Sequence, residues 1–328
     1  MKRILGLLTL SLVITALTIN ITGNFARFFV IKSFQALSSK KPQHVVLDSL
    51  GVPWVWYEGK LGRQRNPVNI AETALKYYAD TSAASHTAFF HCAHWIDSAS
   101  VSLNDSSLIW YNSFPWSQYR LVAPWRSAMS QGRIAQVYLR AFRLTADSQY
   151  LHKAKKAINT LFTEVKDGGV TYKDSTGWWY EEYAGDHAEE SRVLNGMIVV
   201  LLALPEFNQY TSDTVSLFLF NKGALSVEHN LYRYNDKGHS SYDALGHPAS
   251  SWYHHFHISL LDSMYAFTGN KLFATYHTEW KRYREPSFLS LFIAKPTKIY
   301  AFTALVDFLL VLFIVFSFSW LFRKYFTK

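Results

Sequence analysis

The sequence predicts a mainly α-helical protein: an αα-hairpin toroid, or partial (α/α) barrel, with an N-terminal and a C-terminal transmembrane helix. The chain is apolar near both ends over the length of a membrane span. Between these spans the apolar residues recur with helical periodicity, and two helix junctions look alike. A plain helical bundle is the alternative that these patterns leave open.

The first apolar segment, Leu5 to Ile21, follows the basic residues Lys2 and Arg3. This order is typical of a signal peptide or of a signal anchor. Because no clear small-residue cleavage site follows, we favour an uncleaved anchor over residues 1–24.

The second apolar segment, 299–322, contains no Lys, Arg or Glu and is followed by Arg323 and Lys324. Its length suits a helix that spans a bilayer. Basic residues at the outer ends of both spans predict cytoplasmic termini, which puts the intervening residues on the non-cytoplasmic side, periplasmic or lumenal. Asp307 inside this span is either functional, or solvated or neutral, or a partner of the first span.

Residues 25–66 contain Pro42 and Pro53 and predict a connector with an extended lead-in. Helical periodicity dominates the next domain, 67–285. The junctions at 144–150 and 267–273 each place a Thr and a short polar turn before an aromatic residue that opens the next helix, as αα-hairpins do. The expected helices are 69–79, 86–97, 127–144, 148–163, 194–204, 211–230, 257–268 and 271–284.

The composition favours an acidic partner. The 328-residue chain has a formal net charge of +9, and aromatic residues make up 17% of it, with 11 Trp and 20 Tyr. Trp and Tyr suit sugar faces and membrane interfaces as well as protein cores. Nucleic acid is disfavoured, because the charge is dispersed and no recognised motif is present. The single cysteine, Cys92, excludes an intramolecular disulfide and a multi-Cys zinc site.

Two stretches, 168–195 and 232–257, interrupt the helical pattern and are rich in reactive side chains. In the first, the run 178–183 surrounds adjacent glutamates with aromatic residues. This run predicts either sugar binding with acid/base chemistry or a packed aromatic strand with solvated glutamates. The second contains His254, His255 and His257, which are either metal ligands or hydrogen-bond donors to a carboxylate.

A third candidate is Arg126, which lies just before an expected helix. A helix N-terminus with an arginine beside it can bind an anion. The alternative is that this segment is structural and Ser127 caps the helix.

Several short motifs occur in a fixed order along the chain. They are Pro124-Trp125-x-Ser127-Ala128-Met129-x-Gln131-Gly132, Leu139-Arg140-Ala141-Phe142, Gly169-Val170, Trp179-Tyr180-Glu181-Glu182-Tyr183, Val193-Leu194-Asn195-Gly196, Tyr242-Asp243, Tyr253-His254 and Trp280-Lys281-x-Tyr283. Together they resemble the C-terminal helical domain of the D-glucuronyl C5-epimerases, over roughly residues 50–284. The order of the motifs makes the resemblance specific, since each motif alone is a weak indication of the family.

This resemblance implies inversion of D-glucuronate to L-iduronate within an acidic, heparan sulfate-like polysaccharide, with no cofactor and no metal. It implies that the catalytic residues are Glu182, Tyr183, Tyr242 and Tyr253. We expect further residues from the motifs and loops to bind the substrate: Trp125, Arg126, Gln131, Arg140, Trp179, Tyr180, Arg192, Asn195, His254 and His257.

Inversion at C5 requires one base on one face of the sugar and one acid on the other. Loss of the C5 proton creates an enediolate-like dianion, which needs cationic or hydrogen-bond donors at the carboxylate. A tyrosine base needs a neighbouring cation, because its unperturbed pKa is about 10. The candidate cations are Arg63, Arg65, Arg126, Arg140 and Arg192.

The chain departs from the family pattern in ways that put the polymer in doubt. The family's separate β-rich domain is missing, and Asn66 replaces an aromatic residue of the lead-in. The family's arginine after Tyr-Asp-Leu has no match after Asp243. We therefore expect a carboxylate clamp rebuilt from the histidines at 254, 255 or 257.

Other functions remain open on sequence alone. A polysaccharide lyase forms the same carbanion, and a glycosidase would use Glu181 and Glu182 as its pair. Adjacent carboxylates on one strand point to opposite faces, which counts against the glycosidase. A non-catalytic membrane protein for glycan binding or assembly is the remaining class. The sequence also leaves the oligomeric state open, a homodimer included.

Overall fold

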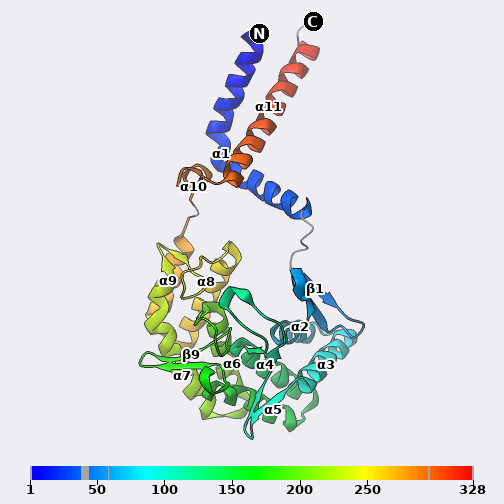
Figure 1. Cartoon of the computed structure of the whole chain (residues 1–328), viewed down its shortest axis with the longest axis vertical. Coiled ribbons are helices and arrows are strands. Elements are labelled where there is room, and N and C mark those ends of the chain that lie inside the picture. Colours follow the sequence, from blue (N-terminus) through cyan, green and yellow to red (C-terminus); the bar gives the residue numbers. More distant parts are fainter. Residues whose placement is uncertain (1, 38–43, 58, 285, 295, 327–328) are drawn as a thin grey trace. The chain divides into compact units, whose positions relative to one another are not determined.

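The computed structural model of the protein describes residues 2–37, 44–57, 59–284, 286–294 and 296–326. It divides into two compact units (Figure 1). One unit consists of Met1–Pro42 with Arg284–Lys328, and the other of Gln43–Tyr283.

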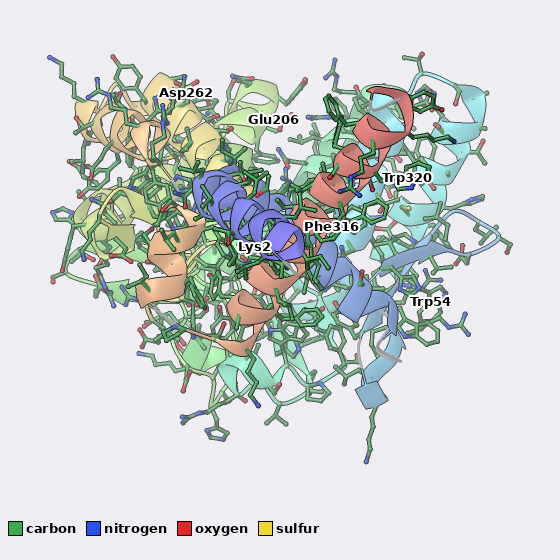
Figure 2. The ribbon with its side chains drawn as sticks, turned by 90° about the horizontal axis from the view of Figure 1, so that it is seen from above. Lys2, Trp54, Glu206, Asp262, Phe316 and Trp320 are labelled. Atoms are coloured by element: carbon green, nitrogen blue, oxygen red, sulfur yellow. The ribbon has the colours of Figure 1, made fainter. Side chains whose placement is uncertain are left out.

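The first unit contains the helices α1 (Lys2–Leu37), α10 (Phe288–Ala294) and α11 (Lys298–Phe326). The apolar windows Ile4–Gly23 and Lys298–Tyr325, with mean hydropathies of 2.2 and 2.6, are long and apolar enough to cross a membrane by length and composition. Figure 2, seen from above, labels Lys2 at the start of α1 and Phe316 on α11. The expected connector was wrong at its beginning, because α1 continues to Leu37.

Small and polar residues on α1 let it pack against α10 and α11. Gly23 lies so close to the Phe288 ring that a Cβ there would be 2.7 Å from it. Asp307 is 3% exposed and accepts a hydrogen bond of 3.0 Å from the Thr22 hydroxyl on α1. Of the alternatives open for Asp307, the structure therefore supports pairing with the first apolar helix.

The second unit is built from αα-hairpins. Within its described residues the helix pairs are α2 (Pro67–Ala79) and α3 (Ala83–Ser98), α4 (Ala128–Thr145) and α5 (Ser148–Asn159), α6 (Leu194–Thr211) and α7 (Thr214–Asn230), and α8 (Ser251–Thr268) and α9 (Lys271–Arg282). The first members, α2, α4, α6 and α8, pack on one another in sequence order, and each also packs on its own partner. The result is an inner and an outer row of helices, as the periodicity predicts.

The turns between paired helices share one local structure at 145–147, 211–213 and 268–270. The central residue has a left-handed φ of 59°, 55° or 66°. The preceding Thr hydroxyl accepts the N–H of the third residue, and the side chain of that residue, Asp or Asn, caps the next helix. Two of these turns are predicted from the sequence, and the one at 211–213 is not.

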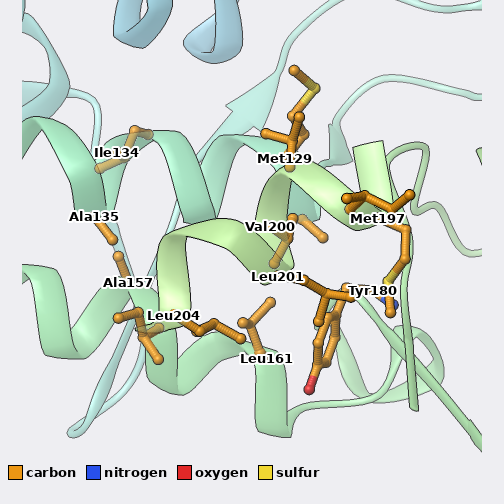
Figure 3. Packing of buried hydrophobic residues seen from close by; sticks show 14 of the residues in the cluster. Met129, Ile134, Ala135, Ala157, Leu161, Tyr180, Met197, Val200, Leu201 and Leu204 are labelled. Atoms are coloured by element: carbon orange, nitrogen blue, oxygen red, sulfur yellow. The ribbon is translucent and has the colours of Figure 1, made fainter. Parts of the chain in front are cut away.

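The core lies where α4, α5 and α6 meet (Figure 3). Ile134, Ala157, Leu161 and Leu204 are all at most 2% exposed in this cluster. Gly132 allows the close approach of α4 and α6, because a Cβ there would lie 3.1 Å from the Val200 Cα. This tight packing gives a rigid base for the loops at the helix ends.

A small antiparallel sheet replaces much of the expected connector. It consists of β1 (His44–Leu47), β2 (Pro53–Tyr57) and β3 (Gly62–Gln64) and belongs to the second unit. The remaining strands form short hairpins: β4 (Val101–Asn104) with β5 (Ser107–Ile109), β6 (Tyr111–Asn112) with β7 (Trp125–Arg126), β8 (Thr171–Asp174) with β9 (Gly177–Tyr180), and β10 (Asn235–Asp236) with β11 (His239–Ser240). Short 3₁₀ turns occur at 59–61, 117–119, 160–162, 165–167 and 231–234.

Candidate active site

The second unit contains a cavity of about 670 Å³. All the predicted catalytic residues line it, namely Glu182, Tyr183, Tyr242 and Tyr253. They come from the loop after β9, the loop before α8 and the first turn of α8. The structure thus brings together residues that are up to 71 positions apart in the sequence (253 − 182).

Backbone hydrogen bonds hold these loops against the helices. Arg126 and Ala184 exchange two N–H···O bonds of 2.8 and 2.9 Å, and Ala128 N–H donates to the Glu181 carbonyl at 2.9 Å. The segment after Tyr180 is therefore fixed to the start of α4. Leu194 N–H donates to the Tyr242 carbonyl at 3.2 Å, which attaches the second loop to the start of α6.

Glu182 presents a carboxyl group to the cavity from a nearly buried position. Its Oε2 has no hydrogen-bond partner among the described residues. The carboxyl fits there because position 196 is a glycine, whose Cβ, if present, would lie 2.1 Å from Oε2. Burial, and next the charge of Glu181, raise the pKa of Glu182 to about 8, although a hydrogen bond with Tyr183 opposes this.

Glu181 is structurally different from its neighbour. It is fully buried, does not line the cavity and accepts hydrogen bonds from the Ser191 hydroxyl at 2.8 Å, Arg192 N–H at 2.9 Å and Tyr183 N–H at 3.2 Å. Burial raises the pKa of Glu181 to about 7 against these hydrogen bonds. Both carboxylate oxygens of Glu181 therefore accept hydrogen bonds that stabilise the loop. Of the two glutamates, Glu182 is the one that lines the cavity.

The three tyrosines form a connected group beside Glu182. Hydrogen bonds link Tyr183 to Tyr242 and Tyr242 to Tyr253, and the rings of the latter two have centroids 4.7 Å apart. Burial, and next the Glu182 charge, raise the pKa of all three phenols above 10. The phenols are protonated near neutral pH and can therefore donate protons.

The expectation that an arginine lowers the pKa of a catalytic tyrosine was wrong. None of the candidate arginines lines the cavity. Each is engaged elsewhere: Arg126 with Asp186 and the Val165 carbonyl, Arg140 with Glu206, Arg192 with Asp174 and Glu190, Arg65 with Asp48, and Arg63 beside the Trp54 and Trp56 rings. The structure thus does not place Arg126, Arg140 or Arg192 at this cavity.

The other substrate-binding candidates divide into two groups. Trp125 and Asn195 line the cavity, and the Asn195 Oδ1 has no partner among the described residues. Gln131, Trp179 and Tyr180 are buried away from it. The Gln131 amide can donate to the carbonyls of Leu108 and Ala157, Trp179 stacks on Tyr234, and the Tyr180 hydroxyl donates to the Leu219 carbonyl at 2.7 Å. These three therefore stabilise the packing around the site.

The expected histidine clamp was also wrong. His254 and His257 are buried on α8 and both contact the Ser240 hydroxyl through Nδ1 at 2.9 Å. Burial lowers the pKa of His257 to about 3, so it stays neutral. His255 is exposed and contacts the Ser251 carbonyl. None of the three lines the cavity, and the described residues contain no cluster suited to a metal ion.

Several lining residues were not predicted. Glu72 and Asn69 lie on α2, Tyr57 lies on β2, and His247 lies in the loop before α8. Asn66 connects two of these elements, because it caps α2 and its amide donates to the Tyr57 hydroxyl at 2.9 Å. The N-cap pattern of Asn66 followed by Pro is visible in the sequence, but its position at the cavity depends on tertiary packing.

Comparison with known proteins identifies a related family. A family model described as "D-glucuronyl C5-epimerase C-terminus" matches residues 104–282. An uncharacterized protein of Methanocaldococcus jannaschii is 27% identical over 267 residues, which cover 74% of this chain and 86% of that protein. The D-glucuronyl C5-epimerase of Caenorhabditis elegans is 38% identical over 95 residues, which cover 28% of this chain and only 15% of that enzyme.

Solved structures show weaker similarity. A cellobiose 2-epimerase of Bacillus thermoamylovorans has a TM-score of 0.48 at 9% identity, covering 74% of this chain and 75% of its own. A sugar epimerase from a ruminal bacterium has a TM-score of 0.48 at 10% identity, covering 85% and 82%. The family match spans more than half of the sequence, and the chain therefore belongs to the D-glucuronyl C5-epimerase family, a family of carbohydrate epimerases.

Proposed function

We propose that this protein inverts D-glucuronate to L-iduronate at C5 within an acidic polysaccharide. The observation that supports this most is the joint position of Glu182 and the three phenols of Tyr183, Tyr242 and Tyr253 in one cavity. A carboxyl group whose pKa is raised to about 8 can accept and return a proton near neutral pH. Neutral phenols supply the protons that inversion also requires.

In the proposed reaction, Glu182 removes the C5 proton, either directly or through Tyr183. The electron pair of the C5–H bond moves towards the uronate carboxylate and forms an enediolate. Tyr253 donates its proton to C5 from the opposite face, and the electron pair returns to form the new C–H bond. Tyr242 lies between these groups and is the route by which the proton returns from Glu182 to Tyr253.

The proposal extends to the fold and the location. The two rows of hairpins correspond to a partial (α/α) barrel, whose loops surround the cavity. The apolar helices anchor the protein in a membrane, and the basic residues outside them favour a catalytic unit on the non-cytoplasmic side. A uronate polymer on that side is the proposed substrate.

The test is proton NMR of uronate polymers incubated with the full-length, detergent-solubilised protein in deuterated water. We expect deuterium at C5 and new iduronate signals. An unsaturated uronate that absorbs in the ultraviolet would instead identify a lyase, which forms the same carbanion and then expels the C4 substituent. Binding of the polymer without exchange or cleavage would identify a non-catalytic glycan-binding protein.

A further inference from the structure

The cavity has an unexpected charge for an acidic substrate. Glu72 and Glu182 line it, while none of the described lining residues is Lys or Arg. Among the described residues of its lining, His247 is the one that can carry a positive charge. A uronate carboxylate bound in this cavity would otherwise meet only neutral groups and other carboxyl groups.

His247 is held by a buried carboxylate. Its Nδ1 lies 2.7 Å from Oδ2 of Asp243, a residue that is fully buried. The same oxygen accepts the Tyr119 hydroxyl at 2.6 Å, and Oδ1 accepts the N–H groups of Leu245 and His247 at 3.1 and 3.2 Å. Because Asp243 serves these donors as an acceptor, Nδ1 carries a hydrogen and donates it, and Nε2 is the nitrogen that can serve a ligand.

The loop around this pair has a fixed shape. Tyr242 N–H donates to the His247 carbonyl at 2.6 Å, and Gly246 has a left-handed φ of 86° that closes the turn. The His247 side chain remains 53% exposed although its Nδ1 is anchored. An exposed ring whose inner nitrogen is held by a buried acid is arranged to offer its outer nitrogen to a ligand.

We propose that His247, as an imidazolium, binds the uronate carboxylate through Nε2–H, and that Asp243 positions it. This inference rests on the proposed function, since it names the residue that binds the carboxylate of the proposed uronate substrate. A charge-assisted hydrogen bond at the carboxylate also stabilises the enediolate, in which negative charge on those oxygens increases.

The test compares a linear polymer containing D-glucuronate with the same polymer after reduction of its carboxyl groups to alcohols. Affinity for both is measured by calorimetry, and KM and kcat of C5 exchange are measured on the first. His247→Gln should weaken binding of the carboxylated polymer and raise KM by about tenfold, the effect of losing one charge-assisted hydrogen bond. Binding of the reduced polymer should not change.

Two further variants separate positioning from folding. His255→Gln is the matched control, because His255 is exposed on α8 and does not line the cavity. It should behave as wild type. Asp243→Asn should lose the preference for the carboxylated polymer and still bind the reduced one, whereas a folding defect would remove both.

The inference would be overturned if His247→Gln had the KM of the wild type and the same preference for the carboxylated over the reduced polymer. A kcat loss of a hundredfold with unchanged KM and unchanged preference would also overturn it, because His247 would then be a proton carrier. These outcomes are distinct from failure of the proposed function. That failure is the absence of C5 exchange in the wild type, and the preference between the two polymers can still be measured without turnover.

Discussion

The neighbouring glutamates allow a decisive comparison, because the same substitution should have opposite effects at the two positions. Glu182→Gln should lower the rate of C5 exchange by about 10²–10⁴-fold, the usual contribution of a general acid or base. It should have little effect on folding, since glutamine keeps an oxygen for the hydrogen bond with Tyr183 and Oε2 of Glu182 has no partner among the described residues. Glu181→Gln should instead destabilise the fold.

The magnitude at Glu181 follows from its hydrogen bonds. One oxygen accepts from the Ser191 hydroxyl and Tyr183 N–H, and the other accepts from Arg192 N–H. A glutamine must direct its NH₂ group towards one of these backbone donors. Losing a hydrogen bond to a charged group and burying an unsatisfied donor should together cost about 3–5 kcal/mol of unfolding free energy.

The pH dependence of stability gives an independent measurement on Glu182. Burial, and next the charge of Glu181, raise its pKa from 4.5 to about 8 in the folded protein. A carboxyl group with a raised folded pKa contributes stability that is fully present below about pH 4.5 and is lost as the pH rises through 8. Glu182→Gln should therefore lose less stability than the wild type between pH 5 and pH 9.

Urea unfolding followed by circular dichroism, at pH 5 and at pH 9, measures both stabilities, and C5 deuterium uptake measures the rate. Over the same range the wild-type exchange rate should rise, because Glu182 becomes ionised. The reasoning is refuted if Glu181→Gln is as stable as the wild type but inactive while Glu182→Gln exchanges normally. The two carboxyl groups would then have exchanged roles.

Three other predictions concern the site and the membrane. Tyr253→Phe and Tyr183→Phe should each abolish C5 exchange, measured by deuterium uptake, while polymer binding persists, because the ring remains and only the proton carrier is lost. Gly196→Ala should reduce exchange by about a hundredfold, since the new Cβ displaces the Glu182 carboxyl, and an unchanged rate would show that the carboxyl position is unimportant. Reporters attached in the loop 208–213 should be active only outside the cytoplasm, and cytoplasmic activity would contradict the proposed orientation.

The helices were predictable because outer helices such as α5 bury one face at a regular spacing and because the helix pairs are joined by recognisable polar turns, although α6 is buried on nearly every side. The turn at 211–213 was missed because Ser216 stands where the two predicted turns are followed by an aromatic residue, Tyr150 or Phe273. The hydrogen bond from Asp213 N–H to the Thr211 hydroxyl is nevertheless the same in kind. A search for Thr followed two positions later by Asp or Asn would have found it.

The beginning of the second unit was not predictable in the same way. Pro53 suggested an irregular segment, but it occupies the first position of β2, where a missing N–H is tolerated. Short strands such as β1 give too little alternation to distinguish a sheet from an extended connector. Their pairing depends on contacts between residues that the local pattern does not reveal.

The residues proposed to be catalytic were predictable as a group that lines one cavity, while the charges around them were not. Glu182 and Tyr183 are adjacent in one motif, so their proximity follows from the sequence. The arginines were misplaced because a long side chain in a basic protein finds a carboxylate near its own backbone, as Arg192 does with Asp174 and Glu190. A formal net charge of +9 therefore describes the whole chain and gives no information on the lining of a cavity.

The two proposals are connected by this local charge. A uronate carboxylate that enters beside Glu182 raises the pKa of that group further, because like charges disfavour ionisation, and Glu72 adds to the effect. A base that is driven towards its protonated form cannot remove the C5 proton. An imidazolium at His247 opposes the substrate's charge and so keeps Glu182 able to ionise when the polymer is bound. His247→Gln should therefore move the pH midpoint of C5 exchange upward as well as raise KM, whereas substitution of a residue with only a packing role would leave that midpoint unchanged.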